Sequence, residues 1–120
     1  DRNLSRGLGD VYKRQLVNNT LYASGQIAIN PATNELISAG IEEETKQVME
    51  NLAAVLDAAG MHFSDVVKCS IFISDMNDFG AINEVYGTYF DDENAPARET
   101  VQVAVLPKRV NVEISLIAVA

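Results

Sequence analysis

The 120-residue sequence contains no tryptophan, a single cysteine and a single histidine. Cys69 cannot form an intrachain disulfide, and its place in an apolar alternating segment favours a buried, inert thiol over a reactive one. One histidine and one cysteine cannot supply the usual ligand set of a zinc site. His62 follows Gly60 near the expected end of a helix, which is more typical of a solvent-facing loop than of catalysis. The sequence therefore predicts neither redox nor zinc chemistry.

Basic residues are also scarce, with 9 Lys and Arg against 17 Asp and Glu, so the formal charge is -8. Residues 16–120 hold five of the basic and fifteen of the acidic residues and carry -10. A surface of this sign repels phosphate backbones, and no basic stripe with interleaved aromatics offsets the repulsion. We therefore expect no nucleic-acid partner.

Long apolar runs are missing as well. No stretch of 18 apolar residues exists to span a bilayer, and residues 1–15 carry six charges where a secretory signal needs an apolar run. These absences predict a cytoplasmic protein without a membrane partner. Residues 1–15 also lack periodicity, so we interpret them as a non-native or disordered head, with a flexible native arm as the alternative. Residues 16–120 have the size of one domain.

From Leu16 onward the sequence alternates between strand and helix patterns. Residues 16–29 read as a hairpin or bent strand interrupted by an Asn18-Asn19 turn and by Gly25, and residues 30–40 as a loop with a short strand at 35–38. The remaining elements are expected as helices at 41–59 and 75–90 and strands at 65–74, 99–106 and 110–120. This order predicts an α+β domain with two helices covering one side of a single sheet.

The pattern also assigns faces to these elements. Gly60 closes the first helix, and its first turn places Glu42, Glu43 and Glu44 in solvent, because three consecutive helical positions cannot converge on one metal ion. Asp75, Asn77 or Asp78 is expected to cap the second helix. The predicted inward positions of the last two strands are Val101, Val103 and Val105, and Val112, Ile114, Leu116 and Ala118.

The opposite face of the last strand runs from polar Asn111, Glu113 and Ser115 to apolar Ile117 and Val119. Two helices on one side of the sheet leave this face uncovered. Contact with other copies of the chain would remove the apolar part of this face from water, so the pattern predicts self-association.

No glycine-rich phosphate loop, nucleophile elbow or dinucleotide fingerprint follows a strand, so any reaction falls to carboxylates, hydroxyls, an arginine and the backbone. Beyond Gln15 the only arginines are Arg98 and Arg109. A guanidinium at a strand edge, as at Arg98, suits bidentate capture of a carboxylate, and an ion pair with Glu99 or another acid is an equal alternative. Glu113, an acid in mid-strand, could polarise a water as general base or acid, although a hydrogen-bonded interface acid is the simpler alternative.

Several blocks of the sequence, in order over about residues 16–120, resemble the reactive-intermediate deaminase (Rid, YjgF-type) family. The early block is Ser24-Gly25-Gln26-Ile27 with Asn30-Pro31. The middle blocks are Asn51-Leu52, Ala58-Ala59-Gly60, Asp65-Val66-Val67-Lys68, and Asn77-Asp78-Phe79 with Asn83 and Tyr86. The C-terminal block is Pro96-Ala97-Arg98, then Val101, Ala104, Leu106-Pro107-Lys108 and Val112-Glu113-Ile114.

The resemblance implies a chorismate-mutase-like fold, with a single mixed sheet and two helices on one face, in a homotrimer with an active site in each cleft between subunits. It implies that Arg98 binds a substrate carboxylate and that Glu113 positions the hydrolytic water. Ser24, Gly25, Asn83 and Thr100 are implied as substrate-binding or pocket-lining residues. The reaction would convert enamines and imines of 2-amino acids, such as 2-aminoacrylate, to 2-keto acids and ammonia. Because an imine is already electrophilic, the resemblance implies no metal or other cofactor.

Two departures from the family pattern bear on activity. Glu99 stands where a small residue usually follows the arginine, and its charge could pair with Arg98 unless the two side chains point to opposite faces. The family's early tyrosine has no counterpart, because Val11 occupies its place and Tyr12 is one residue off. A non-catalytic protein that binds small carboxylates such as 2-keto acids is therefore the alternative function, and RNA cleavage is a third that the charge opposes.

Overall fold

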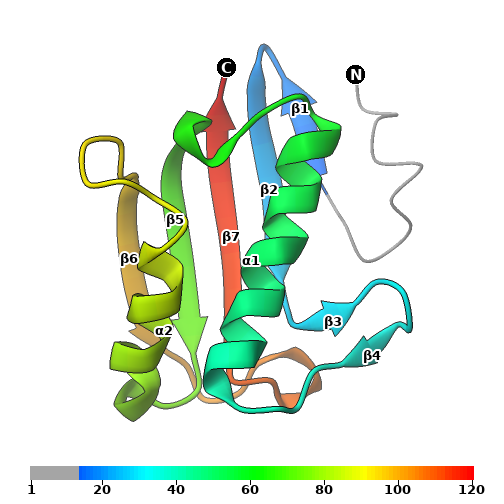
Figure 1. The fold of residues 1–120 in the computed structure, drawn as a ribbon, viewed down its shortest axis with the longest axis vertical. Helices are drawn as coiled ribbons and strands as arrows, with labels where there is room; N and C mark the ends of the chain where they lie inside the picture. The colour runs from blue at the N-terminus through cyan, green and yellow to red at the C-terminus, as the bar shows by residue number, and fades with distance from the viewer. Residues whose placement is uncertain (1–13) are drawn as a thin grey trace.

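The computed structural model describes residues 14–120, which form two layers (Figure 1). One layer is a five-stranded sheet whose strands are, in spatial order, β1 (Arg14–Val17), β2 (Thr20–Gln26), β7 (Val112–Val119), β5 (Val66–Ile73) and β6 (Ala97–Gln102). The other consists of the helices α1 (Ile41–Ala58) and α2 (Phe79–Gly87), which lie side by side on one face of the sheet. The sheet is mixed, because β5 and β6 are parallel and the other pairs are antiparallel. The predicted α+β architecture with two helices on one face is confirmed.

The first two strands form a hairpin. β1 (Arg14–Val17) pairs with β2 (Thr20–Gln26) through a turn in which Asn18 and Asn19 have φ of 51° and 63°. Positive φ at both central residues is the requirement of the tight turn that matches the twist of a hairpin, and asparagine tolerates it. The predicted turn is thus confirmed. Strand β1 includes two residues of the expected head, and the rest of that head, including Val11 and Tyr12, lies outside the described residues.

A small ribbon departs from the expected single sheet. β3 (Ile29–Asn30) pairs with β4 (Glu35–Leu36) as a separate two-stranded sheet beyond the end of β2. The buried Asn51 of α1 fixes the start of this ribbon, because its amide nitrogen donates hydrogen bonds of 3.1 and 2.9 Å to the carbonyls of Ile27 and Ile29. Hydrogen bonds between residues this far apart in the chain leave no local sequence pattern. The sequence therefore predicted a short strand at 35–38, where β4 lies, but no separate strand at the position of β3.

Helix α1 ends at Ala58, one residue before the predicted end, and Gly60, whose φ is 72°, closes it as predicted. Gly60 N donates to Asp57 O at 3.0 Å and Met61 N donates to Leu56 O at 2.8 Å, the paired bonds of a Schellman motif. The other end of the helix corrects a prediction, because Glu44 is buried rather than solvated. Its carboxylate accepts hydrogen bonds from the backbone and side chain of Asn111 and from Val112 N, and so ties α1 to the start of β7.

A crossover through α2 joins the two parallel strands, β5 (Val66–Ile73) and β6 (Ala97–Gln102). The helix is preceded by the 3-10 turn η3 (Met76–Asp78), which Asp75 caps, because its side chain accepts a hydrogen bond from Asn77 N at 2.9 Å. Asp78, at the N-cap position of α2 itself, makes no side-chain capping bond. Helix α2 is shorter than the predicted 75–90. Two further 3-10 turns, η2 (Phe63–Asp65) and η4 (Pro107–Arg109), precede β5 and the last strand.

Strand β6 corrects the predicted inward face of 99–106. It ends at Gln102, and its register pairs Arg98 with the buried Cys69 and Val101 with Phe72. Arg98 and Thr100 therefore lie on the side covered by α2, whereas Val101 is on the uncovered side and 41% exposed. The prediction placed the valines in the core because it used alternation alone. Alternation does not show that α2 provides polar and aromatic partners for an arginine on this side of the strand.

The core lies between the sheet and the helices, and it is made of aliphatic residues from β2, α1, β5, α2 and β7. β7 (Val112–Val119) runs through the centre of the sheet, with Val112, Ile114, Leu116 and Ala118 buried as predicted. The other face of the sheet is uncovered in one chain. It carries the half-buried Glu113, Ser115 and Ile117 of β7 and exposed apolar side chains such as Tyr22 and Val119. We call it the open face.

Neither α1 nor α2, nor any other helix within residues 14–120, has the length and apolar character needed to cross a membrane.

Candidate functional site

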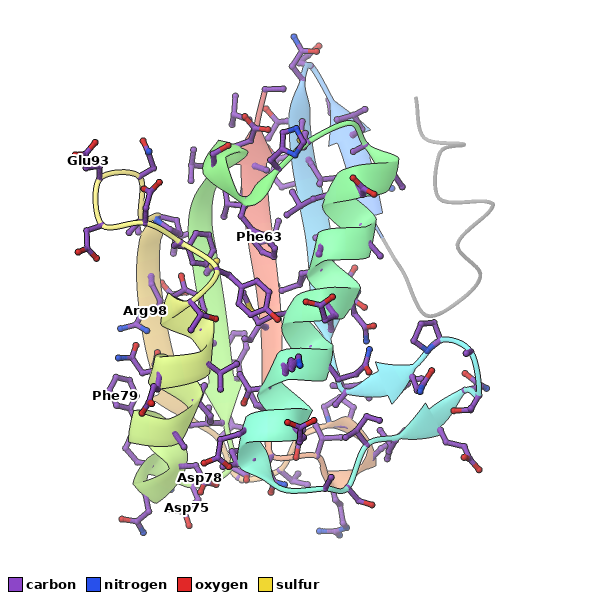
Figure 2. All side chains as sticks on the ribbon, viewed as in Figure 1. Phe63, Asp75, Asp78, Phe79, Glu93 and Arg98 are labelled. Atoms are coloured by element: carbon purple, nitrogen blue, oxygen red, sulfur yellow. The ribbon has the colours of Figure 1, made fainter. Side chains whose placement is uncertain are left out.

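Arg98 lies at the edge of the domain, where β6 meets α2 (Figure 2). Its Nη1 donates a hydrogen bond to Oδ1 of Asn83, and its Cζ is 5.7 Å from the centre of the Phe79 ring and 5.1 Å from that of the Tyr86 ring. Guanidinium over an aromatic face is a favourable cation–π arrangement. Arg98 is nevertheless exposed, so the rest of its donor groups remain accessible to a ligand.

Two buried hydroxyls accompany this arginine. Among the described residues, Oγ1 of Thr100 and the hydroxyl of Tyr86 have no hydrogen-bond partner of ordinary geometry. The Tyr86 hydroxyl lies next to the buried thiol of Cys69, and burial raises the pKa of both groups. Cys69 is therefore protonated at neutral pH, which agrees with the predicted inert thiol. The wall beside Arg98 thus combines one cation with neutral polar groups, a composition suited to a small anion.

Glu113 occupies the open face, in the middle of β7. Its carboxylate lies directly over Gly25 of β2, since a Cβ built on Gly25 would be 1.8 Å from Oε2 of Glu113. Only glycine permits this approach, which occurs where the pairing of β2 with β7 shifts between Ala23 and Gln26. Partial burial removes water from the carboxylate and raises the pKa of Glu113 above the ordinary 4.5. An acid of raised pKa that keeps some solvent contact is suited to proton transfer.

The neighbours of Glu113 match the sequence expectation in part. Ser24 precedes Gly25 on β2 and is exposed on the open face. Asn83 and Thr100, in contrast, are on the side of Arg98. The predicted site residues are therefore divided into two groups: Arg98, Asn83 and Thr100 on the helix-covered side, and Ser24, Gly25 and Glu113 on the open face.

These two groups cannot meet within one chain. Arg98 is on the edge strand β6 and Glu113 is on β7, with β5 between them, so the strands alone separate them by about 10 Å. Their side chains also project from opposite faces of the sheet, as the registers of Arg98 with Cys69 and of Glu113 with Phe72 require. A single ligand can contact both only if a second chain supplies one of them.

Glu99 does not pair with Arg98. It points to the open face, where Lys68 Nζ lies 2.9 Å from its Oε1 and the Ser70 hydroxyl donates to its Oε2. The bond from Ser70, with the nearby Lys68, lowers the pKa of Glu99. Within residues 14–120 no carboxylate lies within ion-pair distance of Arg98, so the alternative of a structural ion pair for Arg98 is wrong for this part of the chain.

Sequence reasoning missed two residues of this site. Phe79 and Tyr86 were noted only within a block that resembles the family and were given no role at the site, yet both rings face Arg98. The sequence does contain a signal for their role, because Phe79, Asn83 and Tyr86 are spaced four and three residues apart and so share one helical face. His62 is exposed, as predicted. No group of three or more His, Cys, Asp or Glu in the described part of the chain could hold a metal ion.

Comparisons with known proteins agree with the fold and with the sequence blocks. The model of the family described as Endoribonuclease L-PSP matches residues 10–120, so the match begins within the stretch expected as a head. Rat 2-iminobutanoate/2-iminopropanoate deaminase is 46% identical over 112 residues, which is 93% of this chain and 81% of the rat protein.

Solved structures extend the agreement to three dimensions. A Rid-family protein from Yersinia pestis is 42% identical with a TM-score of 0.88, covering 100% of this chain and 95% of that one. TdcF of E. coli, crystallised with bound serine, is 41% identical with a TM-score of 0.83, covering 89% of this chain and 85% of TdcF. From the match of the family model to most of its length and from these relatives, the chain belongs to the Endoribonuclease L-PSP family, which is the YjgF/Rid family that its sequence blocks resemble.

Proposed function

We propose that the protein is a hydrolytic deaminase that converts 2-imino acids and their enamine tautomers to 2-keto acids and ammonia, in a cleft between the subunits of a homotrimer. The observation that carries the proposal is the arrangement of Arg98, which is held against α2 with no acid of the described chain neutralising it. An exposed, unpaired guanidinium is a binding group for a carboxylate. The deaminases among the relatives act, as their name says, on 2-iminobutanoate and 2-iminopropanoate.

The chemistry needs few groups. An imine carbon is electrophilic, so the addition of water requires mainly orientation and one group that accepts a proton. Glu113 takes a proton from the attacking water as the oxygen bonds to the imine carbon, and it passes this proton to the imine nitrogen, giving a carbinolamine and the free carboxylate. The carboxylate then transfers the proton of the new hydroxyl to the amine, the C–N bond breaks, and ammonia leaves as the carbonyl forms. Imine and water are consumed, and 2-keto acid and ammonia are formed.

The placement of the site residues supports a site assembled from two chains. Arg98, Asn83 and Thr100 of one subunit would face Ser24, Gly25 and Glu113 of the next, and the open faces would be buried inside the trimer. Support comes from the apolar side chains of this face, among them Tyr22, Val101 and Val119, each more than 40% exposed in a single chain. The charge of -10 over residues 16–120 disfavours RNA as the substrate.

Subunit mixing tests both parts of the proposal in one experiment. Arg98→Ala and Glu113→Ala are each expected to abolish the acceleration of keto acid release from 2-aminoacrylate, generated in the cuvette from serine by a dehydratase. When the two variants are unfolded together in equal amounts and refolded, about one quarter of the inter-subunit sites receive both intact residues, so about a quarter of the parent activity should return. A mass of about 39 kDa, three times the 13.0 kDa chain, is expected from light scattering.

The outcomes separate the alternatives. No recovery on mixing two inactive, folded variants would refute a site shared between subunits. Parent activity in the Arg98→Ala protein would remove the basis for carboxylate capture. Saturable binding of 2-ketobutyrate by the parent without any turnover of 2-aminoacrylate would instead identify a carboxylate-binding protein of the same fold.

A further inference from the structure

We propose that the face of α2 formed by Phe79, Asn83 and Tyr86 is a positioning device that holds the Arg98 guanidinium in place without neutralising its charge, so that Phe79 and Tyr86 set the affinity for the anionic substrate. The inference rests on the proposed function, because it assumes that Arg98 binds the substrate carboxylate. We call these three residues the arginine cradle.

The geometry of the cradle restricts a side chain that would otherwise move freely. Arg98 is exposed on an edge strand, and a free arginine side chain populates many rotamers. Three contacts from one helical face restrain it: the two rings, at 5.7 and 5.1 Å from Cζ, and the Asn83 oxygen that accepts from Nη1. Because the guanidinium is already held in place before the substrate binds, less conformational entropy is lost on binding.

The chemistry of the cradle preserves the charge. A carboxylate partner would hold Arg98 more strongly, but it would also cancel the positive charge and compete with the substrate. An amide oxygen and two aromatic faces attract a cation while remaining neutral. The acid next in sequence, Glu99, is turned to the opposite face and engaged by Lys68 and Ser70.

The cradle is also anchored to the core. Tyr86 is only 7% exposed, and its ring packs on Phe90 with centroids 4.9 Å apart. Phe79 is half-buried at the start of α2 (Figure 2). The buried Tyr86 ring and the half-buried Phe79 ring thus support the exposed guanidinium. Such support from packed side chains is expected if this helix face positions the guanidinium.

Loss of one ring should therefore weaken substrate binding while leaving the chemical step intact. For Phe79→Leu we expect KM to rise about 2- to 5-fold, the range of a partly exposed cation–π contact, with kcat within about twofold of the parent. Adding Tyr86→Leu should multiply the effect to about 4- to 25-fold. The Kd of 2-ketobutyrate, measured by titration calorimetry, should rise by the same factors, which gives a readout that does not depend on turnover.

Matched variants distinguish positioning from general destabilisation. Phe79→Tyr and Tyr86→Phe retain a ring and should restore KM to within about twofold of the parent value. Phe63→Leu removes another half-buried ring, one that packs on Tyr89 and Phe90 and not on Arg98, and should leave KM and Kd unchanged even where it lowers the melting temperature.

An unchanged KM and Kd in folded Phe79→Leu would overturn the inference, as would an equal rise of KM in Phe63→Leu. Its failure is distinguishable from failure of the proposed function. In the first case Arg98→Ala still abolishes binding of 2-ketobutyrate while Phe79→Leu does not affect it. In the second case Arg98→Ala itself leaves binding and turnover at the parent level.

Discussion

Gly25→Ala is the substitution for which the structure makes the sharpest prediction. The backbone at Gly25 is outside the left-handed region, so alanine is compatible with its conformation. The added Cβ, however, would lie 1.8 Å from Oε2, 2.6 Å from Cδ and 2.9 Å from Cγ of Glu113. These three nearest atoms all belong to that one side chain. The perturbation is thus directed at the carboxylate rather than at the fold.

The magnitude follows from the distances. Non-bonded carbon atoms settle about 3.5–4.0 Å apart, so the carboxylate must move by about 1.5–2 Å or change rotamer. A misplacement of about 1 Å at a reacting group can reduce the rate on the order of 100-fold. The cost in stability is small, because an off-rotamer side chain costs about 0.5–1.5 kcal/mol and replacing glycine by alanine returns about 0.4–1 kcal/mol through the unfolded state.

We therefore expect Gly25→Ala to lose on the order of 100-fold in kcat for the hydrolysis of 2-aminoacrylate. Its free energy of unfolding in urea should stay within about 1 kcal/mol of the parent. The assay couples keto acid release to a lactate dehydrogenase, and circular dichroism monitors unfolding.

A double-mutant cycle provides the control. With the Glu113 side chain shortened by Glu113→Ala, the methyl group at position 25 has room, and Gly25→Ala should then be neutral or slightly stabilising. Parent-level kcat in Gly25→Ala with Glu113 intact would refute the reasoning, since the carboxylate would then not need its observed position. An equal loss of stability with and without the Glu113 side chain would also contradict it.

Three other predictions concern charge and burial. Because burial raises the pKa of Glu113 and the base must be ionised, kcat/KM should fall as the pH drops through a midpoint above 4.5; a midpoint at or below this value in the pH–rate profile would contradict the role. Asn83→Asp should place a carboxylate against Arg98 and raise KM for the anionic substrate on the order of tenfold, whereas an unchanged KM would argue against carboxylate capture. Glu44→Ala should lower the free energy of unfolding by about 2–4 kcal/mol, measured in urea, because the donors of Asn111 and the following residue lose a buried, charged acceptor, and Glu44→Gln should lose less.

Much of the fold could be read from local patterns. Helix α1, strand β5 and the buried side of β7 follow from hydrophobic period, and the Asn18-Asn19 turn and Gly60 follow from residues that tolerate positive φ. Such features depend on neighbours within a few residues, so the sequence contains them directly. The uncovered face of β7 was also predictable, because alternation shows that a strand has a second side.

Errors arose where distant segments decide the outcome. Val101 was assigned inward because alternation cannot tell which side of an edge strand a helix covers. Glu44 was expected in solvent, since nothing near it in the chain indicates that β7 begins against the first turn of α1. In β5, strict alternation would place Val67 on the same side as the buried Cys69, but the shift of pairing between Val66 and Lys68 buries Val66 and exposes Val67.

By itself, the sequence determined the residue types of the candidate site, because an arginine at a strand edge and an acid in mid-strand are visible in the pattern and in the family blocks. Only the tertiary structure decided that Arg98 rests on the rings and amide of α2, that Glu113 lies over Gly25, and that the two project from opposite faces of one sheet. The physical reason is that the direction of a side chain along a strand is a local property. Which element covers each face of the sheet depends instead on the strand order and on the crossover connection, and these are set by contacts between segments far apart in the chain.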